Sequence, residues 1–117
     1  MILREIKFSD YKDIRKVVYK NNLNIYDFNY WQDLWLLNPH YKKINKKWTK
    51  GWVLENNDKI VGCLCVFPMI YDFLGREYTV AVATCWVVEE KYRNYSMLLI
   101  NAYFKQKNID VLFSSTA

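Results

Sequence analysis

Long hydrophobic runs and histidines are what this sequence of 117 residues lacks. No apolar run approaches the roughly 18 residues that a membrane span needs. The charged pair Arg4 and Glu5 interrupts the N-terminal stretch where a signal peptide would have its apolar core. The one histidine, His40, excludes a metal site built from several histidines, and its place after Pro39 in a polar segment predicts a solvated side chain. These absences favour a cytoplasmic protein.

Cysteine is also scarce, and its count is odd. Cys63, Cys65 and Cys85 all lie in apolar runs typical of strands, and their spacing fits neither a disulfide framework nor a zinc site. We therefore expect reduced, buried thiols rather than chemically active ones, and no resident metal ion.

The composition is that of a globular protein, because 52% of the residues are hydrophobic and 25% are charged. The length predicts one domain, residues 1–117, and we find no internal repeat, low-complexity segment or linker. Aromatic residues make up 18% of the chain. Their rings supply large buried areas, and their polar N–H and O–H groups also suit pocket walls and partner surfaces.

Much of the net charge of +5 lies in residues 41–50, YKKINKKWTK. The simplest interpretation is a solvated basic loop, and a basic surface also suits an anionic cofactor. An alternative is nucleic-acid binding, in which the lysines contact phosphates while Tyr41 and Trp48 stack on bases.

The pattern of apolar residues predicts the order β, α, α, β, β, β, α, β. Strands are expected at residues 2–6, 52–55, 59–67 with a continuation at 69–73, 76–88 and 109–117, and helices at about 11–20, 30–37 and 95–104. Ser9 or Asp10 is the candidate N-cap of the first helix, and Asp27 or Asn29 that of the second. Pro68 predicts a bulge or a sheet edge, since proline lacks the N–H that a central ladder needs.

These elements predict an α/β (α+β) fold with a mixed, mostly antiparallel sheet and helices on both faces. The turns at residues 56–58 and 74–75 make the middle of the sheet antiparallel. A right-handed crossover through the last helix places the final strand parallel to the strand that ends at Val88.

The chain is organised around residues 80–104, VAVATCWVVEEKYRNYSMLLINAYF. Residues 80–88 contain no charge, proline or glycine, as expected of a strand covered on both faces. The helix that follows has apolar residues on two adjoining stripes, which predicts that it is mostly buried. The loop between them holds Arg93, and Ser96 stands near the helix start. Such a strand-loop-helix unit is suited to bind phosphate, because first-turn N–H groups lack partners within the helix and the helix dipole favours an anion.

The helix expected at residues 30–37 is unusually aromatic. Trp31 and Trp35 lie four residues apart and share one face, so they must be buried together or exposed together. Core packing is the simpler interpretation. The alternative is that both line the pocket of an acceptor substrate, because small-molecule clefts favour aromatic walls.

The element order and the loop resemble the N-acetyltransferase superfamily related to Gcn5 (GNAT). In that family a strand ends in an apolar triplet, an acidic or proline-containing turn follows, and the motif Arg/Gln-x-x-Gly-x-Gly/Ala opens the next helix. Here the triplet is Trp86, Val87 and Val88, the turn is Glu89, Glu90, Lys91 and Tyr92, and the motif is Arg93, Asn94, Tyr95, Ser96, Met97 and Leu98. The hairpin GWVLENNDKIVGCLCV at residues 51–66 is similar to the family's second and third strands.

The resemblance implies transfer of an acetyl group from acetyl-coenzyme A (acetyl-CoA) to an amine. It implies that backbone groups around Trp86, Val87 and Val88 contact the pantetheine arm and that residues 93–98 hold the pyrophosphate. The carboxylates closest to that site are the candidates for a general base, Glu89 and Glu90. Residues 114–116 on the last strand are further candidates to line the cleft.

This sequence departs from the family's pattern in two respects. Ser96 stands where the first glycine of the motif is expected, and Leu98 where the second small residue is expected, which implies a shifted pyrophosphate or a weaker site. The chain also ends after its fifth predicted strand, whereas family members continue with a helix and two strands. We therefore expect a domain that is incomplete at its C-terminus, with a dimer or a partner segment along the last strand. A catalytically inactive binding module is the alternative to an active enzyme.

Overall fold

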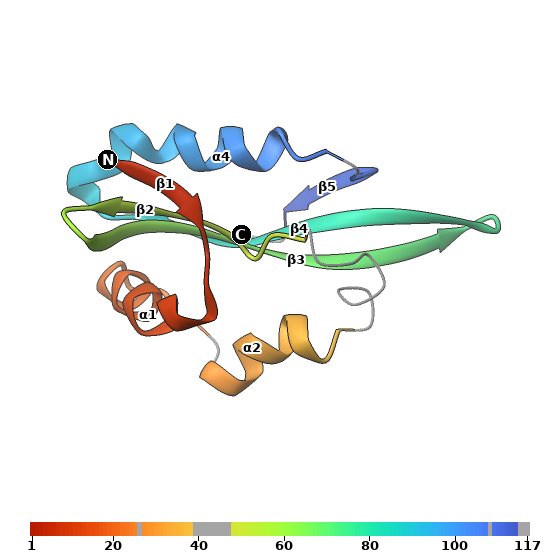
Figure 1. Cartoon of the computed structure of the whole chain (residues 1–117), viewed down its shortest axis with the longest axis horizontal. Coiled ribbons are helices and arrows are strands. Elements are labelled where there is room, and N and C mark those ends of the chain that lie inside the picture. Colours follow the sequence, from red (N-terminus) through yellow and green to blue (C-terminus); the bar gives the residue numbers. More distant parts are fainter. Residues whose placement is uncertain (26, 39–47, 108, 115–117) are drawn as a thin grey trace.

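The structure is a computed structural model that describes residues 1–25, 27–38, 48–107 and 109–114 (Figure 1). In chain order the elements are β1 (Ile2–Glu5), the 3₁₀ helix η1 (Phe8–Asp10), α1 (Tyr11–Lys20), α2 (Phe28–Leu36), β2 (Gly51–Asn56), β3 (Lys59–Phe73), β4 (Arg76–Val88), the 3₁₀ helix η2 (Glu90–Tyr95), α4 (Ser96–Phe104) and β5 (Val111–Ser114). The predicted order of strands and helices is confirmed. In the described ranges, no helix has the length and apolar character needed to cross a bilayer.

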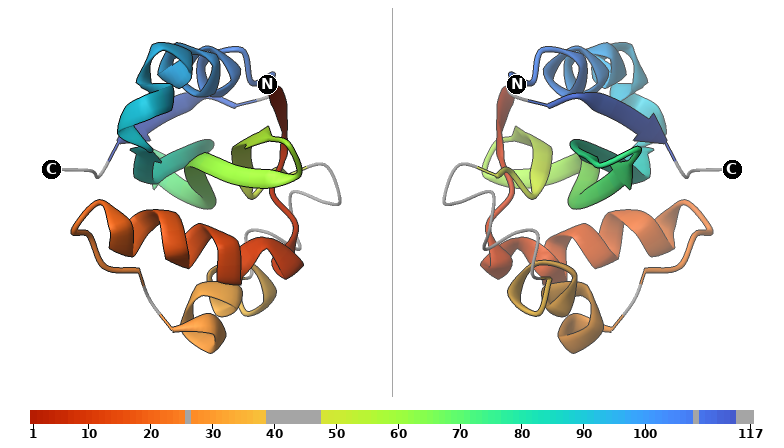
Figure 2. Two further views of the ribbon diagram at one scale, coloured as in Figure 1. Left: turned by 90° about the vertical axis from the view of Figure 1, so that its left-hand side faces the viewer. Right: turned by 90° about the vertical axis from the view of Figure 1, so that its right-hand side faces the viewer.

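The five strands form one sheet in the order β1-β2-β3-β4-β5. Neighbouring strands are antiparallel except β4 and β5, which pair in parallel as the predicted crossover requires. Helices α1 and α2 cover one face of the sheet and α4 covers the other (Figures 1 and 2). The β3–β4 hairpin extends beyond the helices at its far end (Figure 1). The core is therefore split by the sheet into two clusters, one under each helical layer.

Both predicted hairpin turns are present. Asn57 and Asp58 have φ angles of 51° and 62°, and Leu74 and Gly75 have 51° and 79°. Two successive residues with positive φ match the twist of the flanking strands, which is why two-residue hairpin loops favour this conformation. Asn, Asp and Gly adopt it at low cost. Leu74, at the exposed tip of the long hairpin, does not share that advantage.

A charged cluster joins β1, η1 and β2. Arg4 donates from Nη1 and Nη2 to the Asp10 carboxylate at 2.8 and 2.9 Å and from Nε to Glu55 at 3.0 Å. Asp10 is the residue before α1, as predicted, but its carboxylate accepts from the backbone N–H of Lys7 at 2.7 Å instead of capping the helix. Burial raises the pKa of Asp10, but these hydrogen bonds outweigh burial, so the pKa lies below its ordinary value.

Helix α2 begins at the predicted cap, because the Asp27 carboxylate accepts from the backbone N–H of Tyr30 at 2.9 Å. Trp31 and Trp35 are 1% and 0% exposed, so the prediction that they are buried together is confirmed. Their ring centroids lie 5.0 Å apart in an edge-to-face arrangement. The indole N–H of Trp35 donates to the Val66 carbonyl at 3.0 Å, which fixes α2 against β3.

Pro68 lies in β3 where that strand has lost β2 as its neighbour and pairs with β4 alone. Its carbonyl accepts from the side-chain amide of Asn38 at 2.8 Å. Because the N and C=O of one strand residue point to the same side, the missing N–H of Pro68 faces away from β4 and breaks no ladder bond. Pro68 thus lies on a local edge, one of the two predicted outcomes.

The bulge is instead in β4. Leu64 pairs with Trp86 and the next residue, Cys65, pairs with Thr84, so Cys85 has no partner on β3. Cys85 adopts a left-handed backbone with φ 56°, which is uncommon for a residue with a Cβ. The sequence gives no sign of this bulge.

The prediction that α4 is mostly buried is wrong. Leu99 and Tyr103 are buried, but Met97, Leu98 and Phe104 are 59%, 40% and 63% exposed. Only the stripe that faces the sheet is covered, and the Tyr103 hydroxyl donates there to the backbone carbonyl of Ala81 at 2.8 Å. The residues before α4 form the 3₁₀ helix η2 where the sequence predicted an open loop.

Strand β5 begins at Val111, directly after Asp110, whose carboxylate accepts from the backbone N–H and the hydroxyl of Thr79 at 2.8 and 3.0 Å. These bonds lower the pKa of Asp110.

The basic segment, residues 41–50, is described only from residue 48 onward. Trp48 is 6% exposed, so it is not available to stack on bases, as the nucleic-acid alternative would require. The predictions for His40, Tyr41, Ser115 and Thr116 fall outside the described residues.

Candidate active site

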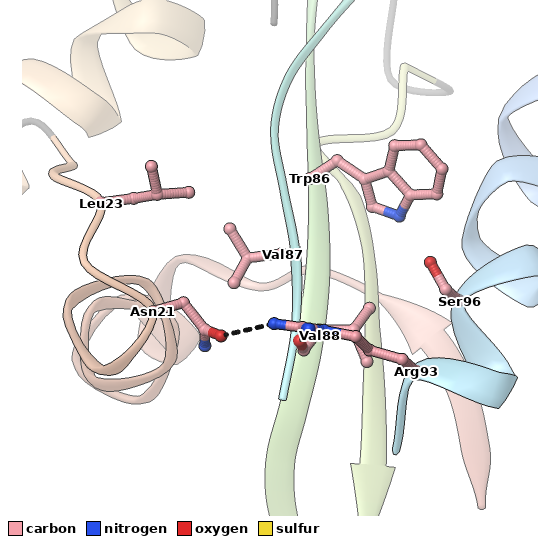
Figure 3. A pocket seen from close by; sticks show the side chains of 7 residues that line it. All are labelled: Asn21, Leu23, Trp86, Val87, Val88, Arg93 and Ser96. Atoms are coloured by element: carbon pink, nitrogen blue, oxygen red, sulfur yellow. Dashed lines mark hydrogen bonds between the residues drawn. The ribbon is translucent and has the colours of Figure 1, made fainter. Parts of the chain in front are cut away.

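A cavity of about 330 Å³ lies where β4 ends, between the C-terminal end of α1 and the N-terminal end of α4 (Figure 3). Its lining residues are Asn21, Leu23, Trp86, Val87, Val88, Arg93 and Ser96. Residues 21–23 therefore meet residues 86–96, which lie more than 60 positions later in the sequence, around one hollow.

The position of the cavity follows from the pairing of β4. The described pairing with β5 ends at Ala83 and Ser114, the last described residue, while β4 continues through residues 84–88 along β3. In the described part of the chain, residues 84–88 have no strand partner on the β5 side. Trp86, which is 40% exposed, points to the side of Ser96, whereas Val87 points toward Leu23 (Figure 3). The end of β4 thus lies between two walls of the cavity, one with Asn21 and Leu23 and the other with Ser96 (Figure 3).

Arg93 connects these walls. Its Nη2 donates to the side-chain oxygen of Asn21 at 3.3 Å, and its Nε donates to the backbone carbonyl of Val88 at 3.4 Å (Figure 3). Both bonds are long for a guanidinium, whose charge-assisted bonds usually measure about 2.7–2.9 Å. An anionic ligand would offer Arg93 stronger partners than either neutral oxygen.

Ser96 opens α4 with φ −56°, a normal helical value, so the backbone does not require glycine at this position. The N–H of Ser96 donates to the carbonyl of Arg93. The expectation that the first-turn N–H groups are unpaired is therefore wrong for Ser96, because the 3₁₀ turn of η2 supplies a partner. The positive end of the helix dipole still points toward the cavity.

The two candidate bases lie at a neighbouring cavity of about 470 Å³, lined by Lys20, Asn21, Glu89, Glu90 and Lys91. Oε1 of Glu89 pairs with Nζ of Lys20 at 3.2 Å, and the Glu89 side chain is only 12% exposed. Glu90 is exposed. Neither carboxylate lines the cavity at the end of β4.

The predicted cofactor residues divide into two groups. Those that line the cavity are Trp86, Val87, Val88, Arg93 and Ser96, and those that do not are Asn94, Tyr95, Met97 and Leu98. Sequence reasoning missed Asn21 and Leu23, because they follow a helix about 65 residues earlier in the chain and only the fold brings them to β4. The weak candidates Trp31 and Trp35 are core residues in this structure, and their role in a substrate pocket stays a prediction.

No protein-family model and no curated protein matches the sequence. Solved structures do match. A tetramutant of the BH1408 protein from Bacillus halodurans aligns with 100% of this chain and 83% of its own, with a TM-score of 0.69 and 15% identity. Glucosamine-6-phosphate N-acetyltransferase from Arabidopsis thaliana aligns with 99% and 82%, with a TM-score of 0.68 and 11% identity.

A third match is a GNAT family acetyltransferase from Staphylococcus aureus, which aligns with 99% of this chain and 86% of its own, with a TM-score of 0.63 and 14% identity. The second and third of these structural neighbours are acetyltransferases. The chain has the GNAT fold along its whole length, as the resemblance in the sequence predicted.

Proposed function

We propose that this chain, with the fold of the GNAT acetyltransferases, is an N-acetyltransferase that transfers an acetyl group from acetyl-CoA to an amine in the cytoplasm. The observation that carries the proposal is the cavity at the end of β4, where Arg93, the start of α4 and residues 84–88 meet, a stretch that pairs with β3 and has no partner on its other side among the described residues. A cation and a helix N-terminus suit a pyrophosphate. Free backbone groups of a strand suit the amides of a pantetheine arm.

In this proposal each residue has a limited task. Arg93 exchanges its long bonds to Asn21 and Val88 for bonds to phosphate oxygens, and the Ser96 hydroxyl donates a further one. Residues 84–88 pair through their backbone with the pantetheine. The Trp86 ring, on the side of Ser96, provides an apolar wall and limits access of water (Figure 3).

The reaction itself requires a neutral amine beside the thioester. The amine nitrogen attacks the carbonyl carbon, the new C–N bond replaces the C–S bond, and the departing thiolate takes up a proton. A donor must stabilise the oxyanion that forms during the attack. The backbone N–H groups of residues 84–88 that point away from β3 are the part of the described chain that we assign to this role.

A second candidate is a binding module without catalysis. One observation favours it: among the described residues, those that line the cavity include no carboxylate, histidine or tyrosine, and Glu89 pairs with Lys20 at 3.2 Å. Such a wall binds a cofactor but offers no side chain that exchanges protons near neutral pH.

Two measurements separate these candidates. Calorimetric titration with coenzyme A tests binding, and mass spectrometry of acetyl-CoA mixed with a panel of primary amines tests turnover. Saturable 1:1 binding with amine-dependent release of coenzyme A supports the enzyme. Binding without release supports the module, and no binding contradicts both.

The apolar end of the sheet motivates a proposal on assembly. Tyr71, Phe73, Tyr78, Val80 and Val111 line a shallow cavity of about 280 Å³ on the extended hairpin and β5. Phe73 is 64% exposed and Val111 is 44% exposed. Contiguous apolar surface of this kind favours association, so we propose a homodimer or a partner segment at this place. Phe73→Ser should shift the sedimentation coefficient toward a monomer, and a wild-type chain that is already monomeric at micromolar concentration would contradict the proposal.

A further inference from the structure

The three cysteines converge on one point in the interior. Their Sγ atoms all lie within 4.8 Å of one another, with Cys63 and Cys65 from β3 and Cys85 from β4. Cys63 and Cys65 are buried, whereas Cys85 is only partly buried. The spacing in the sequence shows only that the first two share a strand face. Only the fold brings the third cysteine, Cys85, to the same place.

The bulge in β4 brings Cys85 to this face. Thr84 pairs with Cys65 and Val87 pairs with Cys63. Between these pairs β4 has two residues, Cys85 and Trp86, where β3 has one, Leu64, so β4 contains one extra residue. Cys85 takes that position with φ 56° and packs against the same core cluster as Cys63 and Cys65. In a regular strand it would face away from Thr84 and from both thiols. The left-handed backbone of Cys85 therefore turns its sulfur toward those of Cys63 and Cys65.

Two polar groups lie beside the three thiols, the Cys85 carbonyl, which accepts from the Cys63 Sγ at 4.0 Å, and the indole of Trp31. The indole N–H of Trp31 is buried and has no hydrogen-bond partner of ordinary geometry among the described residues. Interactions with Cys63 and with this indole lower the pKa of Cys65, but the Cys85 thiol and burial outweigh them, so the pKa lies well above its ordinary value. A buried donor without a partner costs free energy unless an acceptor forms beside it. A metal-bound thiolate would be such an acceptor.

We propose that Cys63, Cys65 and Cys85 form a three-coordinate site for a soft monovalent metal ion, Cu(I). The donor set is sulfur only, which selects soft cations. In the described residues no further histidine, cysteine or carboxylate joins the three. This argues against Zn²⁺, which takes four ligands in structural sites.

The distances fit a trigonal ion after a small movement. Metal–sulfur bonds of about 2.3 Å place three sulfurs roughly 4 Å apart around the ion. The three Sγ atoms are at most 4.8 Å apart in the structure, so each Sγ–Sγ distance would shorten by less than about 1 Å when the ion binds. Binding replaces thiol protons, which pass to solvent, and the ion enters through Cys85, the most accessible of the three.

The test uses the reduced full chain without oxygen and Cu(I) supplied in competition with a chromophoric chelator. We expect one Cu(I) per chain and a sulfur-to-copper absorption band in the ultraviolet. Cys85→Ser should weaken binding by about 100-fold or more, since loss of even an outer-sphere partner costs about 10–100-fold. Met97→Leu removes a sulfur that is 59% exposed on α4 and should leave the affinity unchanged.

A second variant guards against a folding defect. Cys85→Gly also removes the sulfur, but glycine accepts the left-handed φ of 56° without strain, so this chain should fold at least as well as the wild type. Equal Cu(I) affinity in wild type and Cys85→Gly would overturn the proposal. So would binding no tighter than to the chelator, or a disulfide that forms on mild oxidation in a chain that takes up no Cu(I) when reduced.

Discussion

Helices α1 and α4 lie on opposite faces of the sheet and differ in how much of their apolar surface they bury. Helix α1 buries Tyr11, Ile14, Val17 and Val18. On the same face Trp31 and Trp35 of α2 are 1% and 0% exposed, although Phe28 and Tyr30 of that helix are 40% and 55% exposed. On the opposite face, α4 buries Leu99 and Tyr103 but leaves Phe104 63% exposed. Both helical layers are rich in apolar residues, so apolar content alone does not explain the difference.

The number of elements on each face explains it. Helix α1 packs against the sheet and, through Tyr11, against the Phe28 and Trp31 rings of α2. On the other face α4 is the one α-helix described (Figure 2). A single helix on a sheet can bury only the stripe that faces the strands. The composition of a helix thus sets how much apolar surface is available for burial. The elements packed around the helix determine how much of that surface is buried.

The largest expected effect tests this comparison directly. Trp35→Ala should lower the free energy of unfolding by about 3–5 kcal/mol, because it leaves a cavity and removes the hydrogen bond to Val66. Phe104→Ala removes a ring of comparable kind from α4 and should change the free energy of unfolding by no more than about 0.5 kcal/mol. Urea unfolding followed by circular dichroism measures both. Similar losses in the two variants would show that the faces are equally packed.

Arg93 sits between the two layers, since it reaches from η2 to Asn21 after α1. Arg93→Ala should weaken coenzyme A binding by about 1–3 kcal/mol, the range for losing a charge-assisted hydrogen bond. Arg76→Ala is the matched control, because it removes the same charge from the far hairpin. Calorimetry of both variants gives the difference, and equal affinities would argue against a pyrophosphate at Arg93.

The charged cluster at β1 supports the α1 side of the sheet. Asp10→Asn should lower the free energy of unfolding at neutral pH by about 1–2 kcal/mol, because it weakens the hydrogen bonds from Arg4 and Lys7. The folded pKa of Asp10 lies below the ordinary value of 3.8. The contribution is therefore fully present above pH 3.8 and is lost as the pH falls through the folded pKa. Urea unfolding of wild type and variant from pH 3 to 7 should show a gap that closes in acid, and a constant gap would contradict this assignment.

The smallest effect concerns Leu98, at the position where the family has a small residue. Leu98 is 40% exposed and does not line the cavity. Leu98→Gly should leave coenzyme A affinity unchanged or raise it, while the helix loses about 1 kcal/mol of stability. Leu98→Ala separates the two effects, because alanine gives the same space with a better helix propensity. Weaker binding in both variants would show that Leu98 contacts the ligand.

The sequence was informative where the signal is local. The Asp27 cap and the turn at Asn57 follow from side-chain chemistry within a few residues, and the strand order follows from period and length. The bulge at Cys85 is not local, because it depends on how β4 fits against β3. The same holds for Asn21, which reaches the cavity only because α1 ends beside β4. Local patterns therefore predicted the scaffold, and the family resemblance indicated five lining residues, but neither indicated Asn21 and Leu23 on the far wall.

The central claim is that coenzyme A occupies the cavity at the end of β4, and amide NMR tests it most directly. The chain has five tryptophans, whose indole N–H signals are resolved from the backbone. On titration with coenzyme A we predict shift changes at the Trp86 indole and at the Ser96 amide, with the buried Trp31 and Trp35 indoles unchanged. Saturable shifts confined to other surfaces, such as the β3–β4 hairpin, would contradict the account.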